Sequence, residues 1–256
     1  MQDIHKDLLS SGLNINEMNM IRKAISKVKN GGLLDYISTD NIIQFVTCDI
    51  PNERLADVSS GPLLYTDLDY QKVSEYLKKY EVNVSKKSRA ESEFPTYKLN
   101  SASILLGKLK KELELDYNPI VYDDLLENVL EDISKNLNDK IHISGGEATL
   151  KLPSKCGVGG RNTHFVLAMA NKLYKDTKNQ SKVIFSLGTD GADGPTDAAG
   201  AYIDYSTFKK SIDQGINPVE YMNSFDSYSY FKKIGTLIKT GPTHSNLMDI
   251  RIIKSR

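Results

Sequence analysis

Residues 188–201, which read GTDGADGPTDAAGA, hold three aspartates and four glycines directly behind the apolar run VIFSL. Carboxylate oxygens suit a hard cation such as Mg²⁺, whose remaining ligands are usually water and substrate phosphates. We therefore predict that Asp190, Asp193 and Asp197 are the candidate ligands of such a cation. A calcium loop of the EF-hand type is a poor match, because the D-x-[DN]-x-[DN]-G spacing and the closing glutamate are missing.

The glycines of the same loop predict a second kind of contact. Without a Cβ atom, a glycine lets phosphate oxygens approach the backbone N–H groups closely. The predicted nucleotide contacts in this loop are Gly191, Gly194 and Thr196. The alternative needs no ligand, because Thr196 or Asp197 is also a suitable N-cap for a helix.

A further glycine-rich segment, GVGGRN at residues 157–162, leads into an apolar-faced helix. Helix N-termini bind anions through their N–H groups, and a guanidinium pairs well with phosphate or carboxylate. Gly159, Gly160 and Arg161 are therefore candidate anion contacts, with a tight turn and a surface arginine as the alternative. The segment is not a dinucleotide fingerprint, because G-x-G-x-x-G requires glycine where Asn162 stands.

Asp49 follows a predicted strand at residues 42–47, where a carboxylate is a candidate base or cation ligand. An Asx-turn is the alternative at this position. His142 lies in an apolar strand, which is typical of a satisfied core residue. Because the histidines have no cysteine nearby, a transition-metal site is not expected.

The helices and strands that the sequence pattern predicts around these residues indicate an α/β fold. The apolar run at residues 183–187 predicts a strand that is covered on both faces. Helices are predicted at residues 3–9, 16–28, 70–80, 101–115, 123–137, 163–175, 206–214 and 217–231. Strands are predicted at residues 42–47, 140–143, 147–152, 182–187 and 248–253, with a turn at residues 144–146 and a polar loop at residues 81–96.

Composition narrows the class of partner. The 256 residues contain 33 basic and 33 acidic side chains, so no excess of charge suggests nucleic acid or an anionic membrane surface. A small-molecule substrate is expected. The two cysteines form no disulfide framework, and no apolar stretch is long enough for a membrane span, so we expect a cytoplasmic protein. Two domains are predicted, at residues 1–137 and 138–256.

Several of these motifs together resemble a known family. The loop at residues 188–201, SGGEAT at residues 144–149, GGRN at residues 159–162 and TGPT at residues 240–243, with Asn246 and Asp249, resemble the MOFRL domain of the glycerate 2-kinase family. Upstream, SSGLNINEMNMIRKAISKVKNGGLL and CDIPNERLADVSSGP resemble two further elements of that family. The resemblance covers nearly the whole chain.

The resemblance implies a partial Rossmann-like catalytic domain at residues 1–137, followed by a second α/β domain, the MOFRL domain. It implies transfer of the γ-phosphoryl group of ATP to the 2-hydroxyl of D-glycerate, with Mg²⁺. The family's active site lies in a cleft, so Asp49 and Arg161 are expected to be catalytic, with Asp190 and Asp193 nearby.

Some family elements are absent or altered. Family chains carry an additional N-terminal part with SGGGSA and G-x-G-K-A elements, and neither occurs in this sequence. Thr163 and His164 replace the usual Gln-Glu, and Leu63 replaces the threonine of SGPT. We expect activity to require an N-terminal-half polypeptide as partner. The alternatives are a non-catalytic fragment or binding module of the same fold and, disfavoured by the absent fingerprint, a hydroxypyruvate reductase.

Overall fold

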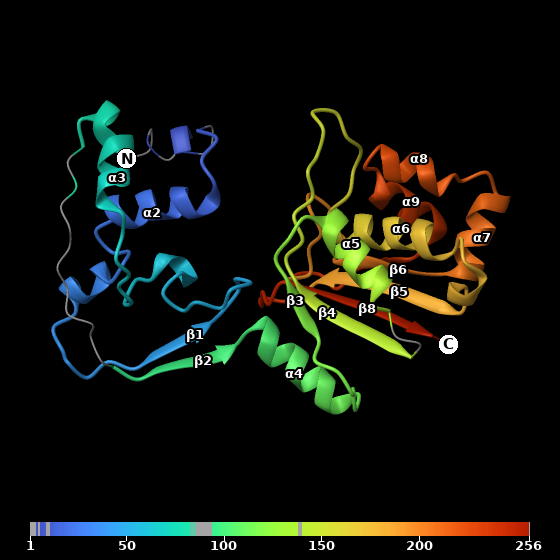
Figure 1. Cartoon of the computed structure of the whole chain (residues 1–256), viewed down its shortest axis with the longest axis horizontal. Helices are drawn as coiled ribbons and strands as arrows, with labels where there is room; N and C mark the ends of the chain where they lie inside the picture. The colour runs from blue at the N-terminus through green and yellow to red at the C-terminus, as the bar shows by residue number, and fades with distance from the viewer. Residues whose placement is uncertain are drawn as a thin grey trace. The chain divides into compact units, whose positions relative to one another are not determined.

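The computed structural model describes residues 4, 6–8, 11–82, 84, 94–137 and 140–255. The chain forms two compact units. The first comprises Met1–Cys48 and Glu53–Leu99, and the second comprises Asp49–Asn52 and Asn100–Arg256 (Figure 1). The domain boundary predicted at residue 138 lies outside the described residues and stays a prediction.

The first unit is built around two amphipathic helices, α2 (Ile15–Ile25) and α3 (Tyr70–Leu77). A capping box begins α2, because the Asn14 side chain accepts from the Glu17 backbone while the Glu17 side chain accepts from the Asn14 backbone. The two helices bury Ile21 against Val73 and Leu77. Short 3₁₀ helices lie at Gly32–Tyr36, Val58–Ser60 and Lys78–Tyr80, and strands β1 (Gln44–Thr47) and β2 (Thr96–Asn100) pair as a two-stranded sheet.

The second unit is organised by a six-stranded mixed sheet of order β3-β4-β8-β5-β6-β7. Only β3 and β4 pair in parallel, while the remaining neighbours are antiparallel. In this order β8, the last of these strands in the sequence, lies between β4 and β5. The strands are β3 (Ile120–Tyr122), β4 (Ile141–Gly146), β5 (Lys182–Gly188), β6 (Gly200–Asp204), β7 (Leu237–Ile238) and β8 (Asp249–Ser255).

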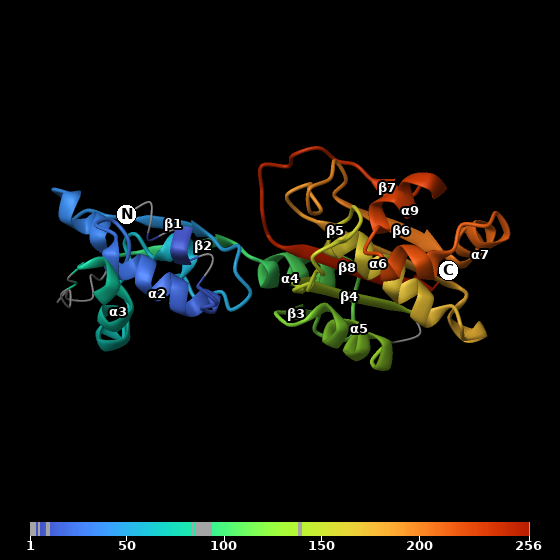
Figure 2. The same ribbon diagram turned by 90° about the horizontal axis from the view of Figure 1, so that it is seen from above.

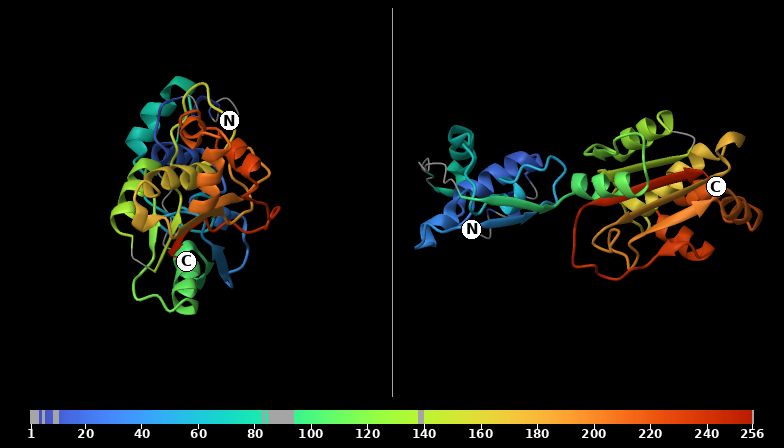
Figure 3. Two further views of the ribbon diagram at one scale, coloured as in Figure 1. Left: turned by 90° about the vertical axis from the view of Figure 1, so that its right-hand side faces the viewer. Right: turned by 90° about the horizontal axis from the view of Figure 1, so that it is seen from below.

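Helices cover both faces of this sheet unequally. On one face, α5, α6 and α9 pack on the sheet through the larger hydrophobic core. On the other face, α4 packs on it through a smaller cluster around Leu106 and Ile143 (Figures 1, 2 and 3). Val183 and Phe185 of β5 are only half-buried, which corrects the prediction of a strand covered on both faces. The helices are α4 (Ala102–Glu112), α5 (Leu126–Lys135), α6 (Arg161–Leu173), α7 (Tyr205–Asp213), α8 (Pro218–Asn223) and α9 (Ser227–Ile234).

The α/β class predicted from the sequence is confirmed, but several local predictions are wrong. The turn predicted at residues 144–146 is the buried end of β4, and residues 147–152 form no second strand. The helix predicted at residues 217–231 is divided into α8 and α9 by Phe225, whose φ of 55° is left-handed. Thr196 and Asp197 cap no helix, because strand β6 follows them.

Within the described ranges, none of the helices combines the length and apolar character required to cross a membrane.

Candidate active site

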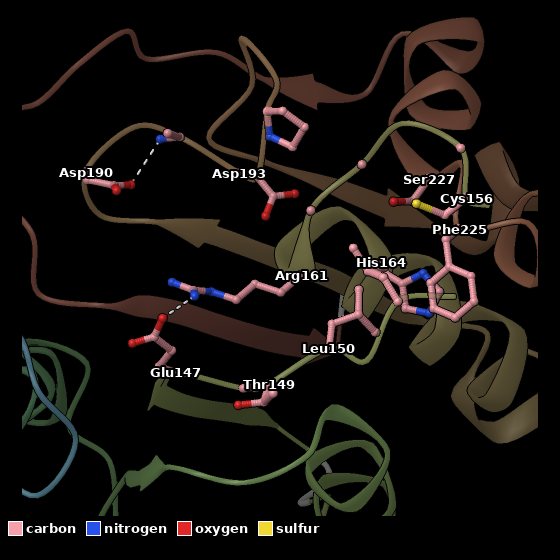
Figure 4. A pocket seen from close by; sticks show the side chains of 18 residues that line it. Glu147, Thr149, Leu150, Cys156, Arg161, His164, Asp190, Asp193, Phe225 and Ser227 are labelled. Atoms are coloured by element: carbon pink, nitrogen blue, oxygen red, sulfur yellow. Dashed lines mark hydrogen bonds and ion pairs between the residues drawn. The ribbon is translucent and has the colours of Figure 1, made fainter. Parts of the chain in front are cut away.

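A pocket of about 510 Å³ lies in the second unit, where α6 begins (Figure 4). Its lining comes from residues 147–164, from the acidic loop at residues 190–195 and from residues 225–227. The pocket therefore brings together two glycine-rich segments that are separate in the sequence. The predicted site residues among its lining are Gly159, Gly160, Arg161, Asp190, Asp193 and Gly194.

Arg161 is the cation of this pocket, and two carboxylates hold it. Its Nε donates to Asp249 Oδ2 at 2.7 Å, and its Nη1 donates to Glu147 Oε1. Its side chain remains 33% exposed, so part of the guanidinium still faces the pocket. Burial alone lowers the pKa of Arg161, but Asp249 and Glu147 raise it above its ordinary value. A permanently charged, oriented guanidinium suits an anionic ligand.

Asp249 is the buried centre of a charged network behind Arg161. Besides Arg161, its carboxylate accepts from Arg251 Nη2 at 3.1 Å and from Asn162 Nδ2 at 2.9 Å. Arg251 is itself 1% exposed and also donates to the carbonyl of Gly145 at 3.0 Å. The sequence analysis named Asp249 only as part of the family resemblance and gave Arg251 no role, although charged residues among the isoleucines of strand β8 were a visible signal. The network fixes the base of the Arg161 side chain.

Asp193 caps helix α6. Its Oδ1 accepts from the Asn162 backbone, and its Oδ2 accepts from the Thr163 backbone and hydroxyl, each at 2.8 Å. Burial raises the pKa of Asp193, and these hydrogen bonds only partly oppose it. The anion site predicted at this helix N-terminus is therefore filled by the protein's own carboxylate. Metal binding by Asp193 stays a prediction, and its oxygens already have protein partners.

The predicted glycine contacts have packing roles in the structure. A Cβ atom on Gly160 would lie 2.3 Å from Asp193 Oδ1. Gly191 has a φ of 88°, and a Cβ there would lie 2.0 Å from the carbonyl oxygen of Gly241. Gly191 is absent from the pocket lining, as is Thr196, whose hydroxyl donates to the Asp193 carbonyl at 2.8 Å. Nucleotide contacts at these glycines and at Thr196 stay predictions.

Asp190 is an exposed carboxylate of the acidic loop. Its Oδ1 accepts from the Ala192 backbone at 3.0 Å. Among the described residues, no group of three histidine, cysteine or acidic side chains could hold a metal by itself. Mg²⁺ needs fewer protein ligands than this when phosphates complete its shell. Metal binding by Asp190 stays a prediction.

Asp49 lies elsewhere. It is exposed, belongs to the short segment Asp49–Asn52, and does not line the pocket. Its predicted catalytic role stays a prediction. His142 is buried, as expected for a core residue, and its ring stacks on Tyr117; its Nε2 has no hydrogen-bond partner among the described residues.

Two aromatic residues complete the pocket, and sequence reasoning missed both. The ring of His164 stacks on that of Phe225, with centroids 4.9 Å apart. His164 lies one helical turn beyond Arg161, and this spacing was the available signal. Phe225 gave no signal, because its position depends on the turn between α8 and α9.

Two family models match the chain. The "MOFRL family" matches residues 140–249, and "Domain of unknown function (DUF4147)" matches residues 1–92. The first match includes the glycine-rich segment, Arg161, the acidic loop and Asp249. The chain is therefore an α/β protein whose residues 140–249 match the MOFRL family.

Relatives place this architecture more specifically. The D-glycerate 2-kinase of Thermotoga maritima is 30% identical over 98% of this chain, and the glycerate 2-kinase of Picrophilus torridus is 31% identical over 98%. The crystal structure of the Thermotoga maritima glycerate kinase matches with a TM-score of 0.83 and 28% identity, covering 100% of this chain and 67% of that chain. Along nearly its whole length the chain is therefore similar to glycerate 2-kinases. It spans 66% and 62% of the lengths of the two curated relatives.

Proposed function

We propose that this chain takes part in ATP-dependent phosphorylation of D-glycerate, giving 2-phospho-D-glycerate and ADP. The observation that carries the proposal is the oriented Arg161 guanidinium in a pocket that also exposes Asp190. The names of the relatives support the same reaction, because both are called glycerate 2-kinases.

In this reaction the 2-hydroxyl oxygen of glycerate forms a bond to the γ-phosphorus of ATP. The bond from that phosphorus to the β,γ-bridging oxygen breaks, and ADP leaves with the bonding electrons. The hydroxyl proton passes to a base, for which Asp49 is our candidate. Arg161 neutralises charge on the phosphoryl oxygens, since phosphoryl transfer depends mainly on positioning and electrostatic stabilisation.

The charge of the pocket supports a requirement for a cation. Its charged lining residues are Glu147, Asp190, Asp193 and Arg161, so the described lining has a net formal charge of −2. This charge opposes the entry of a free polyphosphate. Mg²⁺ bound to the nucleotide would supply the missing positive charge. We propose Asp190 as its first protein contact, with Asp193 as the second candidate.

We further propose that turnover requires a polypeptide carrying the SGGGSA and G-x-G-K-A elements. Neither element occurs in the 256 residues. In the assay, 2-phosphoglycerate formation from ATP and D-glycerate is measured for the chain alone and for the chain mixed with such a polypeptide. The absence of product in both cases would contradict the kinase proposal.

Arg161→Ala tests the role of the guanidinium. We expect the turnover number to fall by about a hundredfold or more, because an electrostatic contact to the transferred group is lost. Arg161→Lys keeps a charge without the planar fork and should retain intermediate activity. Circular dichroism checks that both variants fold. Wild-type turnover in a folded Arg161→Ala variant would remove Arg161 from the site.

A further inference from the structure

The pocket has an aromatic end whose role the proposed reaction leaves open. The rings of His164 and Phe225 are nearly parallel, with 9° between their planes. Figure 4 shows this ring pair on the opposite side of the pocket from Glu147 and Asp190. One pocket therefore presents charged groups at one end and a stacked pair of rings at the other.

The backbone holds Phe225 in an unusual conformation. Its φ of 55° is left-handed, a region that bulky residues rarely adopt. The turn that contains it is closed by two hydrogen bonds, from Phe225 N to Met222 O at 3.1 Å and from Asp226 N to Tyr221 O at 2.9 Å. The fold thus keeps this ring beside the pocket despite local strain.

His164 contributes an unpartnered polar atom to the same end. The residue is 8% exposed, and its Nδ1 is buried without a hydrogen-bond partner in the described part of the chain. Burial lowers the pKa of His164, so the ring is neutral near pH 7 and carries one N–H donor and one acceptor nitrogen. A buried polar atom without a partner is rare in folded proteins. Because Nδ1 is itself enclosed by the protein, the pocket would present the His164 ring rather than this atom to a ligand.

We infer that this aromatic end holds the base of a purine nucleotide, with the phosphates directed toward Arg161. The inference rests on the proposed function, which supplies the nucleotide. D-Glycerate is a short hydroxylated carboxylate with no flat surface for a ring pair. A purine has a π face for stacking and ring-edge groups that hydrogen-bond to an imidazole. The pocket volume of about 510 Å³ lies in the range of small-molecule sites.

The test separates the base from the phosphates. Isothermal titration calorimetry measures binding of ADP and of inorganic tripolyphosphate, both with Mg²⁺, to the full chain. His164→Ala and Phe225→Asn should each weaken ADP binding by about tenfold, which is typical for loss of base stacking. Binding of tripolyphosphate should stay unchanged. His244→Ala, at an exposed histidine outside the pocket lining, is the matched control and should bind both ligands normally.

Phe225→Asn removes the ring but suits the left-handed backbone, so this variant decides the result if His164→Ala fails to fold. ADP affinity that is unchanged in a folded variant overturns the inference and leaves the kinase proposal intact. An equal loss for ADP and tripolyphosphate also overturns it, because the ring would then act on the whole pocket. A wild-type chain that binds neither ligand contradicts both proposals.

Discussion

Asp249 shows how a residue outside the reach of a ligand can decide the geometry of a site. Its side chain is 0% exposed and accepts from Arg161, Arg251 and Asn162. Buried charges are costly unless they are paired, so such a cluster persists only where every member has partners. The position of Arg161 therefore depends on a carboxylate that does not line the pocket.

Asp249→Asn should be strongly destabilising. The substitution removes the counter-ion of the buried Arg251 side chain, and breaking such a pair costs about 3–5 kcal/mol. Urea denaturation followed by circular dichroism measures the change. Asp197→Asn is the control, because Asp197 forms an exposed ion pair with Lys239 and should change stability little. Similar effects of the two substitutions would contradict the network.

Asp193 illustrates what sequence cannot reveal about single residues. The acidic loop was recognised, and Asp193 was expected to serve a ligand. Its actual partners, Asn162 and Thr163, lie 31 and 30 positions away. A cap supplied from another segment leaves no local pattern, whereas the local capping box of Asn14 and Glu17 does.

At the level of elements, helices with clear apolar periodicity were predicted to within a few residues. Examples are α6, predicted at residues 163–175, and α7, predicted at residues 206–214. Strands were harder, because β6 is short, begins with glycine and exists through pairing with β5. The double glycine of β4 suggested a turn, but Gly146 lies at the end of the strand. Glycine is needed there because the Tyr122 backbone of the neighbouring strand leaves no room for a Cβ atom.

Two glycine-to-alanine substitutions in different helical contexts should have opposite effects. At Gly160 the added methyl group would collide with Asp193, and we expect a loss of about 1–3 kcal/mol from overpacking and a weakened cap. Gly107 lies within α4 with no atom within 4 Å of an added Cβ, so alanine should stabilise by about 0.5–1 kcal/mol. Thermal denaturation compares the two variants. Stabilisation by Gly160→Ala would show that the loop and helix are not in contact.

Because two histidines are buried, we expect the free energy of unfolding to decrease in mild acid. Burial lowers the pKa of both His142 and His164 below the ordinary value of 6.5. The unfolded chain therefore takes up protons at a higher pH than the folded chain, and stability is lost as the pH falls below that value.

We expect the urea concentration at half-unfolding to decrease as the pH is lowered from about 7.5 to about 5. His142→Phe and His164→Gln should each flatten this dependence, whereas His244→Gln, at an exposed site, should not. If both buried-site variants kept the full wild-type pH dependence, the acid sensitivity would have another source.

On the scale of the whole molecule, each compact unit has a core of its own. The first unit buries Leu77 among the residues of α2 and α3, and the second buries Leu167 in α6. Separate cores allow separate unfolding, so we expect two calorimetric transitions.

Leu77→Ala and Leu167→Ala assign these transitions. Each substitution leaves a cavity and should cost about 2–5 kcal/mol in its own unit. Differential scanning calorimetry should show one transition shifted to lower temperature by each variant, and a different one in each case. A single transition shifted by both variants would mean that the units unfold together.

Arg161 and His164 both belong to the start of α6, so the helix fixes the distance between their backbone positions. Three residues along an α-helix advance by about 4.5 Å, and this spacing cannot change without unwinding the turn that Asp193 caps. A ligand that reaches both side chains must match the spacing between charge and ring. For the nucleotide proposed above, the distance from base to phosphates would then matter as well as the chemical groups themselves.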